Sequence, residues 1–305
     1  MLNSLIRLPS WKVKTVPEHK RFAVFILTHG RPKNVITAKT LKKSGYTGRT
    51  YIIIDNEDPL GDEYRKEFGA EWVIEFDKKA VAETFDTADT QPDRLAIVYA
   101  RNACFQIARN LELDYFVQLD DDYNSFLHRF PNGKKLGSTA IRNMDDVIEA
   151  MLTFLDDTGA KTVAFAQGGD LIGGINGGHK HRLKRKAMNS FFLKTNDPVE
   201  FIGKINDDVN AYIVHGSRGQ LFFTVMDVCL TQTQTQKASG GMTDAYLNSG
   251  TYVKSFYSVI MSPSCVKIGT IGVTNNRFHH AIKWDNAVPK IIHESYKKIR
   301  TGASK

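Results

Sequence analysis

Short apolar runs alternate with amphipathic stretches along the N-terminal part of the chain. Four of these runs have the length and the β-branched or aromatic content of buried strands: 22–27, 51–54, 72–74 and 115–119. Helical patterns separate them, and this strand–helix–strand order predicts a parallel sheet with right-handed crossovers. We therefore expect an α/β fold with a Rossmann-like nucleotide-binding half and a mostly parallel central sheet.

The pattern continues less regularly after residue 123. A helix is expected from about Asn143 to Asp157, ended by Gly159. Residues 77–94 are polar and predicted to be irregular, whereas 94–110 has helical spacing. The other expected elements are strands at 162–166, 188–193, 220–230, 258–261 and 266–269, and helices after Asn206 and at 243–253.

No internal repeat or clear linker divides the chain. We therefore expect a single domain over residues 1–305. Its donor-nucleotide half is expected at about 21–125, and an acceptor half with a basic tail at about 126–305.

Three consecutive aspartates, Asp120, Asp121 and Asp122, end the apolar run 115–119. Three carboxylates at the end of a buried strand repel one another and resist desolvation, so a hard divalent cation is expected to hold them. Alternate residues of an extended chain share one side, which lets Asp120 and Asp122 face the same ion. The alternative is a solvated acidic turn in which Asp121 or Asp122 caps the next helix.

Other acidic residues extend this prediction. Asp55 follows the strand 51–54, and the carboxyl ends of parallel strands face one way. Asp55 and the aspartate triplet should therefore lie along the same edge, where open α/β sheets bind their ligands. A later pair, Asp207 and Asp208, precedes a helix and either caps it or supplies a catalytic base.

A glycine-rich segment leads into the densest positive run of the chain. Residues 168–178 contain six glycines, which predicts a backbone that bends freely or lets a ligand approach closely. The Lys-Ser/Thr of a Walker loop is missing after them. The basic run that follows is either a solvated face or a contact to a phosphate backbone. Its members are Lys180, Arg182, Lys184, Arg185 and Lys186.

Composition and charge narrow the class of protein. The chain has 305 residues, of which 42% are hydrophobic, so it can bury a full core. Its net charge of +8 suits a polyanionic partner around an acidic pocket. No apolar stretch is long enough for a membrane span or a signal peptide, so a cytoplasmic protein is expected. The three scattered cysteines, Cys104, Cys229 and Cys265, are expected to be reduced core residues.

An ordered set of motifs resembles the TET/JBP-associated glycosyltransferases, a largely bacteriophage-borne family of GT-A type that is linked to sugar transfer onto hydroxymethylated DNA bases. The resemblance spans about residues 21 to 225. Its motifs are Ile26–Pro32, Ile53–Asp58, Ala100–Asn102, Gln118–Tyr123 and Asn206–Asn210.

The resemblance implies a role for each matching residue. Asp120 and Asp122 match the D-x-D that holds Mn²⁺ or Mg²⁺ against the donor diphosphate, with His279 or His280 as candidates for a further ligand. Asp208 matches the second acid of an acceptor-side pair; Asp207 replaces the Glu of many relatives. The positions implied to contact the donor are Thr28, Arg31, Asp55, Asn56, Arg101, Asn102, Asp120 and Asp121.

The function implied is transfer of a sugar, from a nucleoside-diphosphate sugar such as a UDP-sugar, to 5-hydroxymethylcytosine or 5-hydroxymethyluracil in phage DNA, inside the infected host cell. A carboxylate such as Asp208 can take the proton of the attacking hydroxymethyl oxygen. Other readings of the same residues are a glycosyltransferase with a glycan or protein acceptor, a nucleotidyltransferase, and a non-catalytic DNA-binding protein whose acids are caps.

Overall fold

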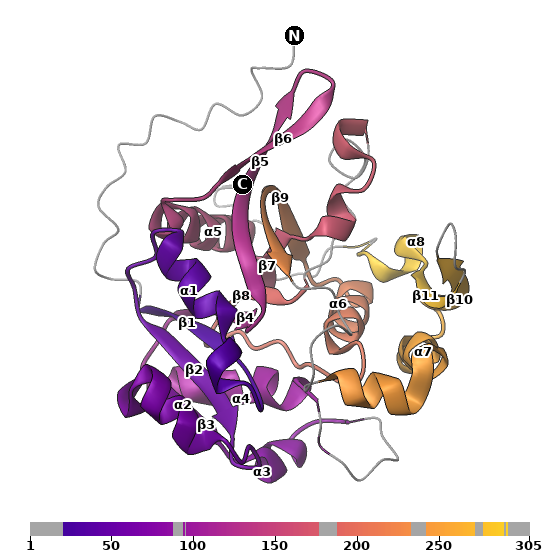
Figure 1. The fold of residues 1–305 in the computed structure, drawn as a ribbon. Coiled ribbons are helices and arrows are strands. Elements are labelled where there is room, and N and C mark those ends of the chain that lie inside the picture. The colour runs from indigo at the N-terminus through magenta and orange to yellow at the C-terminus, as the bar shows by residue number, and fades with distance from the viewer. Residues whose placement is uncertain are drawn as a thin grey trace, which may run out of the picture.

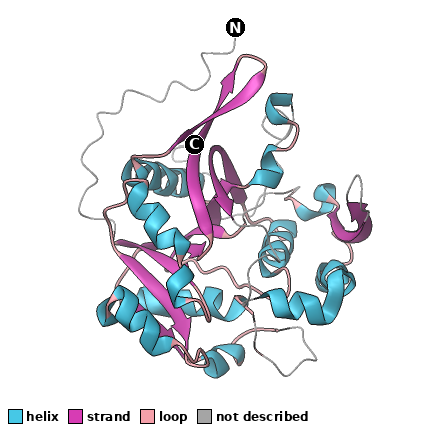
Figure 2. Cartoon of the chain, viewed as in Figure 1, coloured by secondary structure: helices cyan, strands magenta, loops and turns pink. Residues whose placement is uncertain are grey.

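The computed structural model describes residues 21–87, 94, 96–176, 188–232, 242–271, 277–289 and 291. A mixed sheet of nine strands runs through the molecule, with helices on both of its faces (Figures 1 and 2). No described helix is both long and apolar enough to cross a membrane. In spatial order the strands are β3 (Val73–Phe76), β2 (Thr50–Asp55), β1 (Phe22–Leu27), β4 (Tyr115–Asp120), β8 (Ser190–Lys194), β7 (Thr162–Ala166), β9 (Phe222–Gln232), β5 (Tyr123–Asn132) and β6 (Lys135–Ala140).

The first four strands form the parallel half that the apolar runs predict. β1 lies between β2 and β4 and is parallel to both, and β3 is parallel to β2. β8 is antiparallel to β4 and joins this half to the later strands. The predicted α/β fold is therefore confirmed.

Helices cover the two faces of the sheet because the strands alternate. In β1, Val24 and Ile26 belong to one buried cluster, whereas Phe25 and Leu27 belong to the other. The first cluster includes residues of α1, α2 and α5, and the second includes residues of α4 and α6. The helices are α1 (Ile36–Lys43), α2 (Gly61–Phe68), α3 (Lys78–Ala82), α4 (Val98–Asn110), α5 (Met144–Thr158), α6 (Asp207–Ser217), α7 (Met242–Met261) and α8 (Trp284–Ala287).

Some local expectations are confirmed. Gly159 ends α5 in the left-handed conformation, with φ of 62°, which glycine adopts without a steric penalty. All three cysteines are buried and free.

Other local expectations are wrong. α3 forms within the segment expected to be irregular, and the Asp77 side chain caps it by accepting a hydrogen bond from the Ala80 amide at 2.9 Å. The expected strand 258–261 is the last part of α7. A separate antiparallel pair, β10 (Val266–Ile271) and β11 (Arg277–Ile282), packs beside α7 and includes a strand that was not predicted.

Candidate functional site

The aspartate triplet lies at the carboxyl edge of the parallel half. Asp120 is the last residue of β4 and is paired in register with Leu27 at the end of β1. Asp55 ends β2, which runs parallel to β1 on its other side. The topology therefore brings Asp55 and the triplet to one edge, as expected from their positions at strand ends.

The buried side chain of Arg101 contacts one acid of each acidic cluster. Arg101 of α4 is only 1% exposed, and its guanidinium lies over the rings of Phe191 and Phe201. Its Nε donates to Asp207 Oδ2 at 2.7 Å, and its Nη2 donates to Asp120 Oδ1 at 3.2 Å. Arg101 thus links the end of β4 to the start of α6 from within the core, and its contacts are to acids of the site.

Asp121 contacts residues in the turn after β1 instead of Arg101. The Thr28 hydroxyl donates to Asp121 Oδ2 at 2.6 Å, and Arg31 Nη2 lies 3.3 Å from Asp121 Oδ1. The Tyr64 hydroxyl accepts from the Arg31 amide at 2.8 Å and shares a hydrogen bond with Thr28 at 3.0 Å. Asp121 therefore holds the turn after β1 in place. This arrangement leaves Arg31 Nε buried without a hydrogen-bond partner.

The ionised forms of Asp120 and Asp122 are disfavoured by burial and by neighbouring negative charges. Burial raises the pKa of Asp120 to about 7, with Arg101 opposing the rise and Asp122 adding to it. Burial and the charge of Asp121 raise the pKa of Asp122 to about 6. These carboxylates thus gain from a nearby cation beyond the one charge that Arg101 supplies.

This donor set fits Mg²⁺ or Mn²⁺. Such ions bind through one or two carboxylates and complete their shell with water and substrate phosphates. Among the described residues, no three His, Cys, Asp or Glu side chains gather closely enough to hold a metal by themselves. An ion held by Asp120 and Asp122 would therefore need oxygen atoms of water and of a bound diphosphate to complete its shell.

Metal affinity should depend on pH in a defined direction. Because a raised pKa keeps Asp120 and Asp122 protonated in the acidic range, protons compete with the metal below about pH 7. We expect the Kd for Mn²⁺ to increase about tenfold between pH 7.5 and pH 6.0, measured by isothermal titration calorimetry. Equal affinity at the two pH values would show that neither carboxylate binds the ion.

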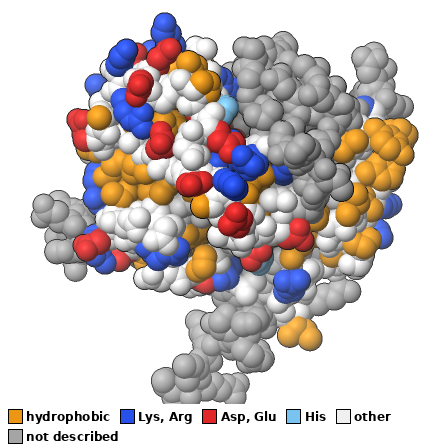
Figure 3. Space-filling view, turned by 90° about the horizontal axis from the view of Figure 1, so that it is seen from below, with side chains coloured by type: hydrophobic (Ala, Val, Ile, Leu, Met, Phe, Trp, Pro, Cys, Tyr) orange, Lys and Arg blue, Asp and Glu red, His pale blue; other side chains and the backbone are white. Residues whose placement is uncertain are grey.

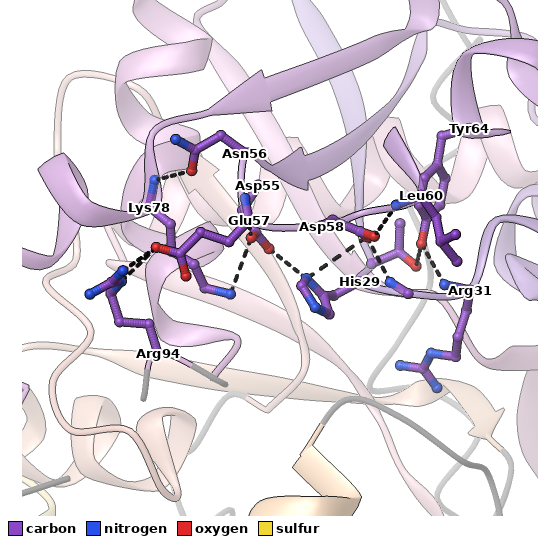
Figure 4. A network of polar contacts seen from close by, with 12 residues as sticks. His29, Arg31, Asp55, Asn56, Glu57, Asp58, Leu60, Tyr64, Lys78 and Arg94 are labelled. Carbon is purple, nitrogen blue, oxygen red and sulfur yellow. Dashed lines mark hydrogen bonds and ion pairs between the residues drawn. The ribbon is translucent and has the colours of Figure 1, made fainter. Parts of the chain in front are cut away.

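Asp55 organises a second part of the edge, drawn in Figure 4. His29 Nδ1 lies 2.8 Å from Asp55 Oδ2, and the buried Lys78 Nζ lies 3.2 Å from Asp55 Oδ1. Although burial acts to raise it, the hydrogen bond from His29 and the charge of Lys78 lower the pKa of Asp55. Oδ1 also accepts from the Glu57 amide at 3.1 Å. Asp55 therefore stays ionised and fixes the orientation of His29 and Lys78.

The neighbouring acids Asp58 and Glu57 brace the same edge. Asp58 accepts hydrogen bonds from the amides of Gly30 at 2.7 Å and Leu60 at 2.9 Å, tying the turn after β1 to the turn after β2. Glu57 accepts from Arg94 Nε at 2.8 Å. These contacts form a network that holds the turns after β1 and β2 together (Figure 4).

The two asparagines of the predicted donor set are bound to backbone. The Asn102 amide both donates to and accepts from the backbone of Phe201, at 2.8 and 3.0 Å. Asn56 Oδ1 accepts from the Lys78 amide at 3.0 Å. Asn102 thus holds the segment before α6 against α4, whereas Asn56 holds the start of α3 close to Asp55.

The second acidic cluster begins α6. Burial raises the pKa of Asp207, and the ion pair with Arg101 opposes the rise. Asp208 is 8% exposed, and its Oδ1 accepts from the Val209 amide at 2.8 Å. The N-cap residue of α6 is Asn206, without a side-chain cap hydrogen bond, so neither aspartate is the N-cap that the capping interpretation requires. Instead, Asp207 is linked to Asp120 through Arg101.

The two histidines lie on β11 beside this cluster. Their rings are 4.2 Å apart, and His280 Nδ1 lies 3.5 Å from Asn206 Nδ2. Burial lowers the pKa of His280 to about 4, which keeps its ring neutral as a metal ligand must be. Metal binding by His279 or His280 stays a prediction. The basic run of Lys180, Arg182, Lys184, Arg185 and Lys186 lies outside the described residues.

Sequence reasoning missed three residues of this edge, namely His29, Tyr64 and Lys78. His29 stands in a turn after a strand, which is a positional signal that could have found it. Tyr64 and Lys78 reach the edge from α2 and α3, and only the tertiary structure shows that they do.

The chain is similar to known proteins in both sequence and fold. Residues 22–241 match the model of a family described as "TET-Associated Glycosyltransferase". No curated protein matches the chain.

Several solved structures are similar in fold. One is the mannosyltransferase PcManGT from Pyrobaculum calidifontis in complex with GDP-Man and Mn²⁺, with 13% identity and a TM-score of 0.47. The match covers 79% of this chain and 64% of that one, so this chain spans less than two thirds of its length. Another is glucosyl-3-phosphoglycerate synthase from Mycobacterium tuberculosis in complex with Mn²⁺, UDP and phosphoglyceric acid, with 8% identity, a TM-score of 0.46 and 87% of each chain covered.

Proposed function

Because the family match covers most of its length, the chain belongs to the TET-associated glycosyltransferase family, and we propose that it transfers a sugar from a nucleoside-diphosphate sugar to a hydroxymethylated pyrimidine in DNA. The observation that carries this proposal is the pairing of Asp120 and Asp122 at the end of β4 with a second acidic cluster that Arg101 holds beside them. The acceptor is supported by the TET association of the family and by the net charge of +8.

The donor half of the site has the groups that a nucleoside diphosphate needs. Asp120 and Asp122 are the residues proposed to hold Mn²⁺ or Mg²⁺. When bound there, the ion supplies positive charge to the leaving diphosphate. We assign Arg31 the role of donating to a phosphate oxygen, and the lack of a hydrogen-bond partner for its Nε supports this role. The polar cluster of His29, Asp55 and Lys78 at the ends of β1 and β2 is proposed to bind the nucleoside, probed most simply as UDP.

The acceptor half centres on Asp208. In the proposed reaction the hydroxymethyl oxygen forms a bond to the anomeric carbon of the sugar while the bond from that carbon to the diphosphate oxygen breaks. The hydroxyl proton passes to the Asp208 carboxylate, and the diphosphate leaves with the bonding electrons. Asp207 is bound by Arg101 at 2.7 Å, so we assign it the role of positioning the start of α6.

The assignment of Asp208 gives a kinetic prediction. Changing Asp208 to Asn should lower kcat about a hundredfold, because the isosteric amide cannot accept the proton. The KM for the donor should stay close to its original value, since Asp208 is not assigned to the donor half. A higher KM for the donor with kcat unchanged would show that Asp208 acts in the donor half of the site and not as the base.

The function itself is tested by product analysis. Oligonucleotides carrying cytosine, 5-hydroxymethylcytosine or 5-hydroxymethyluracil are incubated with Mn²⁺ and a panel of nucleotide sugars, digested to nucleosides and weighed by mass spectrometry. We expect a glycosylated nucleoside from a hydroxymethylated oligonucleotide and none from the cytosine control. Equal transfer to the control, or transfer to glycans or proteins alone, would contradict the DNA acceptor.

A further inference from the structure

The turn that carries the aspartate triplet is short and largely buried. β4 ends at Asp120 and β5 begins at Tyr123, but the two strands are not neighbours in the sheet. Other acids lie at the surface among basic side chains, as on the face drawn in Figure 3. Asp121, by contrast, is 2% exposed, and Tyr123 is 0% exposed. Buried backbone N–H and C=O groups need partners within the protein, and β4 and β5 supply none to each other.

One residue of α1, Thr37, supplies partners for three backbone groups of this turn. Its hydroxyl donates to the Asp120 carbonyl at 2.6 Å and accepts from the Tyr123 amide at 2.9 Å. Its own amide donates to the Asp121 carbonyl at 3.1 Å. Thr37 is itself 0% exposed, so these hydrogen bonds lie in the interior, where they are electrostatically stronger than in water.

The start of α1 explains why Thr37 can make these bonds. The first four amides of an α-helix have no partner within the helix, and Thr37 is the second residue of α1. Val35, the N-cap of α1, makes no side-chain cap hydrogen bond, so the Asp121 carbonyl provides a partner that the helix lacks. A threonine hydroxyl both donates and accepts, and it can therefore bind a carbonyl and an amide of the same turn at once.

We infer that Thr37 is a positioning residue of the cation site, because it fixes the backbone of residues 120–123 and with it the directions of the Asp120 and Asp122 carboxylates. This inference rests on the proposed function. Without an ion the two carboxylates repel each other, and a fixed backbone limits how far they can turn apart. Residues that orient metal ligands in this way commonly change metal affinity by roughly 10- to 100-fold.

The side chain of Asp121 gives the turn a second attachment to the same segment. Thr28 and Arg31 contact its carboxylate, and both belong, with Thr37, to the residues 28–37 that follow β1. This segment therefore holds the turn by its backbone and by the one aspartate of the triplet that is not assigned to the ion.

Three substitutions separate the hydroxyl from the fold. Thr37→Val keeps the shape and the amide but removes the hydroxyl, so it should raise the Kd for Mn²⁺ about tenfold, measured by isothermal titration calorimetry with UDP present. Thr37→Ser keeps the hydroxyl and should bind Mn²⁺ within about twofold of the original protein. Thr37→Ala also removes the hydroxyl, with a residue that favours a helix, and it replaces the valine variant if circular dichroism shows that the latter does not fold.

A matched control lies on the same helix. Thr40 of α1 is also buried, at 7% exposed, and Thr40→Val should leave the Kd for Mn²⁺ unchanged. Hydrogen exchange of the metal-free protein gives a second measurement that does not depend on activity. The Tyr123 amide should exchange faster in Thr37→Val than in the original protein, and at the original rate in Thr40→Val.

Kinetics distinguish positioning from a loss of folded enzyme. In Thr37→Val the Mn²⁺ concentration for half-maximal rate should rise about tenfold, whereas kcat at saturating Mn²⁺ should stay close to the original value. A variant that only unfolds in part would lose kcat at every Mn²⁺ concentration, and that result would overturn the inference.

The outcomes separate Thr37 from the proposed function. If the original protein binds Mn²⁺ with UDP, Asp122→Asn does not, and Thr37→Val binds it normally, the role of Thr37 is wrong and the cation site stands. If Thr37→Val and Thr40→Val weaken Mn²⁺ binding equally, the loss comes from the packing of α1 and the inference is overturned. If the original protein binds no Mn²⁺ in the presence of UDP, the proposed cation site fails, and the role of Thr37 fails with it.

Discussion

Asp122→Asn should lower the rate of sugar transfer about a thousandfold, which corresponds to about 4 kcal/mol of lost transition-state stabilisation. The substitution keeps the size of the side chain and removes one of the two carboxylates proposed to hold the cation. The departing diphosphate then develops its charge without a neutralising ion nearby. The rate is measured with saturating UDP-sugar, Mn²⁺ and a hydroxymethylated oligonucleotide.

An exposed acid provides the control for this substitution. Asp157 lies near the end of α5, far along the chain from the aspartate triplet, and Asp157→Asn should leave the rate unchanged. Titration of Mn²⁺ into both variants in the presence of UDP should show binding only to the Asp157 variant. A normal rate in Asp122→Asn would remove Asp122 from the site.

Arg101→Met should destabilise the protein by about 3–5 kcal/mol at pH 7.5, because it leaves Asp120 and Asp207 buried without their shared cation. The methionine keeps much of the packing against Phe191 and Phe201, so the expected loss comes mainly from the charge. The free energy of unfolding is measured by urea denaturation.

Two further variants separate the charge from the packing. Arg109 lies on the same helix and is exposed, so Arg109→Met should change stability by no more than about 0.5 kcal/mol. The double variant Arg101→Met with Asp207→Leu removes both partners of the Arg101–Asp207 ion pair, so Asp207 no longer leaves a buried charge without its cation. Part of the lost stability should therefore return. A single Arg101→Met variant as stable as the original would show that the ion pairs are not holding the two acidic clusters together.

The parallel half of the fold could be predicted because each strand carries its own signal. The runs ending at Leu27, Asp55 and Asp120 are apolar because both faces of these strands are buried. Since parallel strands end at one edge, the sequence also predicted that Asp55 and Asp120 would meet there.

The C-terminal half was harder because its signals are short or mixed. Residues 258–261 form an apolar run of strand length, but they lie on α7, where Ser255 and Ser258 are buried three residues apart on the helix. A run of four residues is too short to show whether its apolar positions repeat with the period of a strand or of a helix. Tertiary packing therefore decides which of the two forms. β11 contains two histidines and an arginine and therefore lacks the alternation that marks a strand.

The role of Arg101 could not be predicted, because it depends on residues that are distant in the sequence. Arg101 was expected to contact the donor, whereas in the structure it is buried and paired with two aspartates from distant parts of the chain. It stands three residues before the buried Cys104 on α4, a spacing that places it on the apolar face of the helix. Its partners, however, lie at the end of β4 and the start of α6, and no local pattern shows that these two points come together.

The central claim is that Asp120 and Asp122 hold a divalent cation against a donor diphosphate. Crystals grown with UDP and Mn²⁺ test it most directly, with anomalous diffraction recorded near the manganese edge. We expect an anomalous peak beside the carboxylates of Asp120 and Asp122 when UDP is bound, and the loss of this peak in Asp122→Asn. UDP bound to the protein with manganese elsewhere, or with none at these two residues, would contradict the claim.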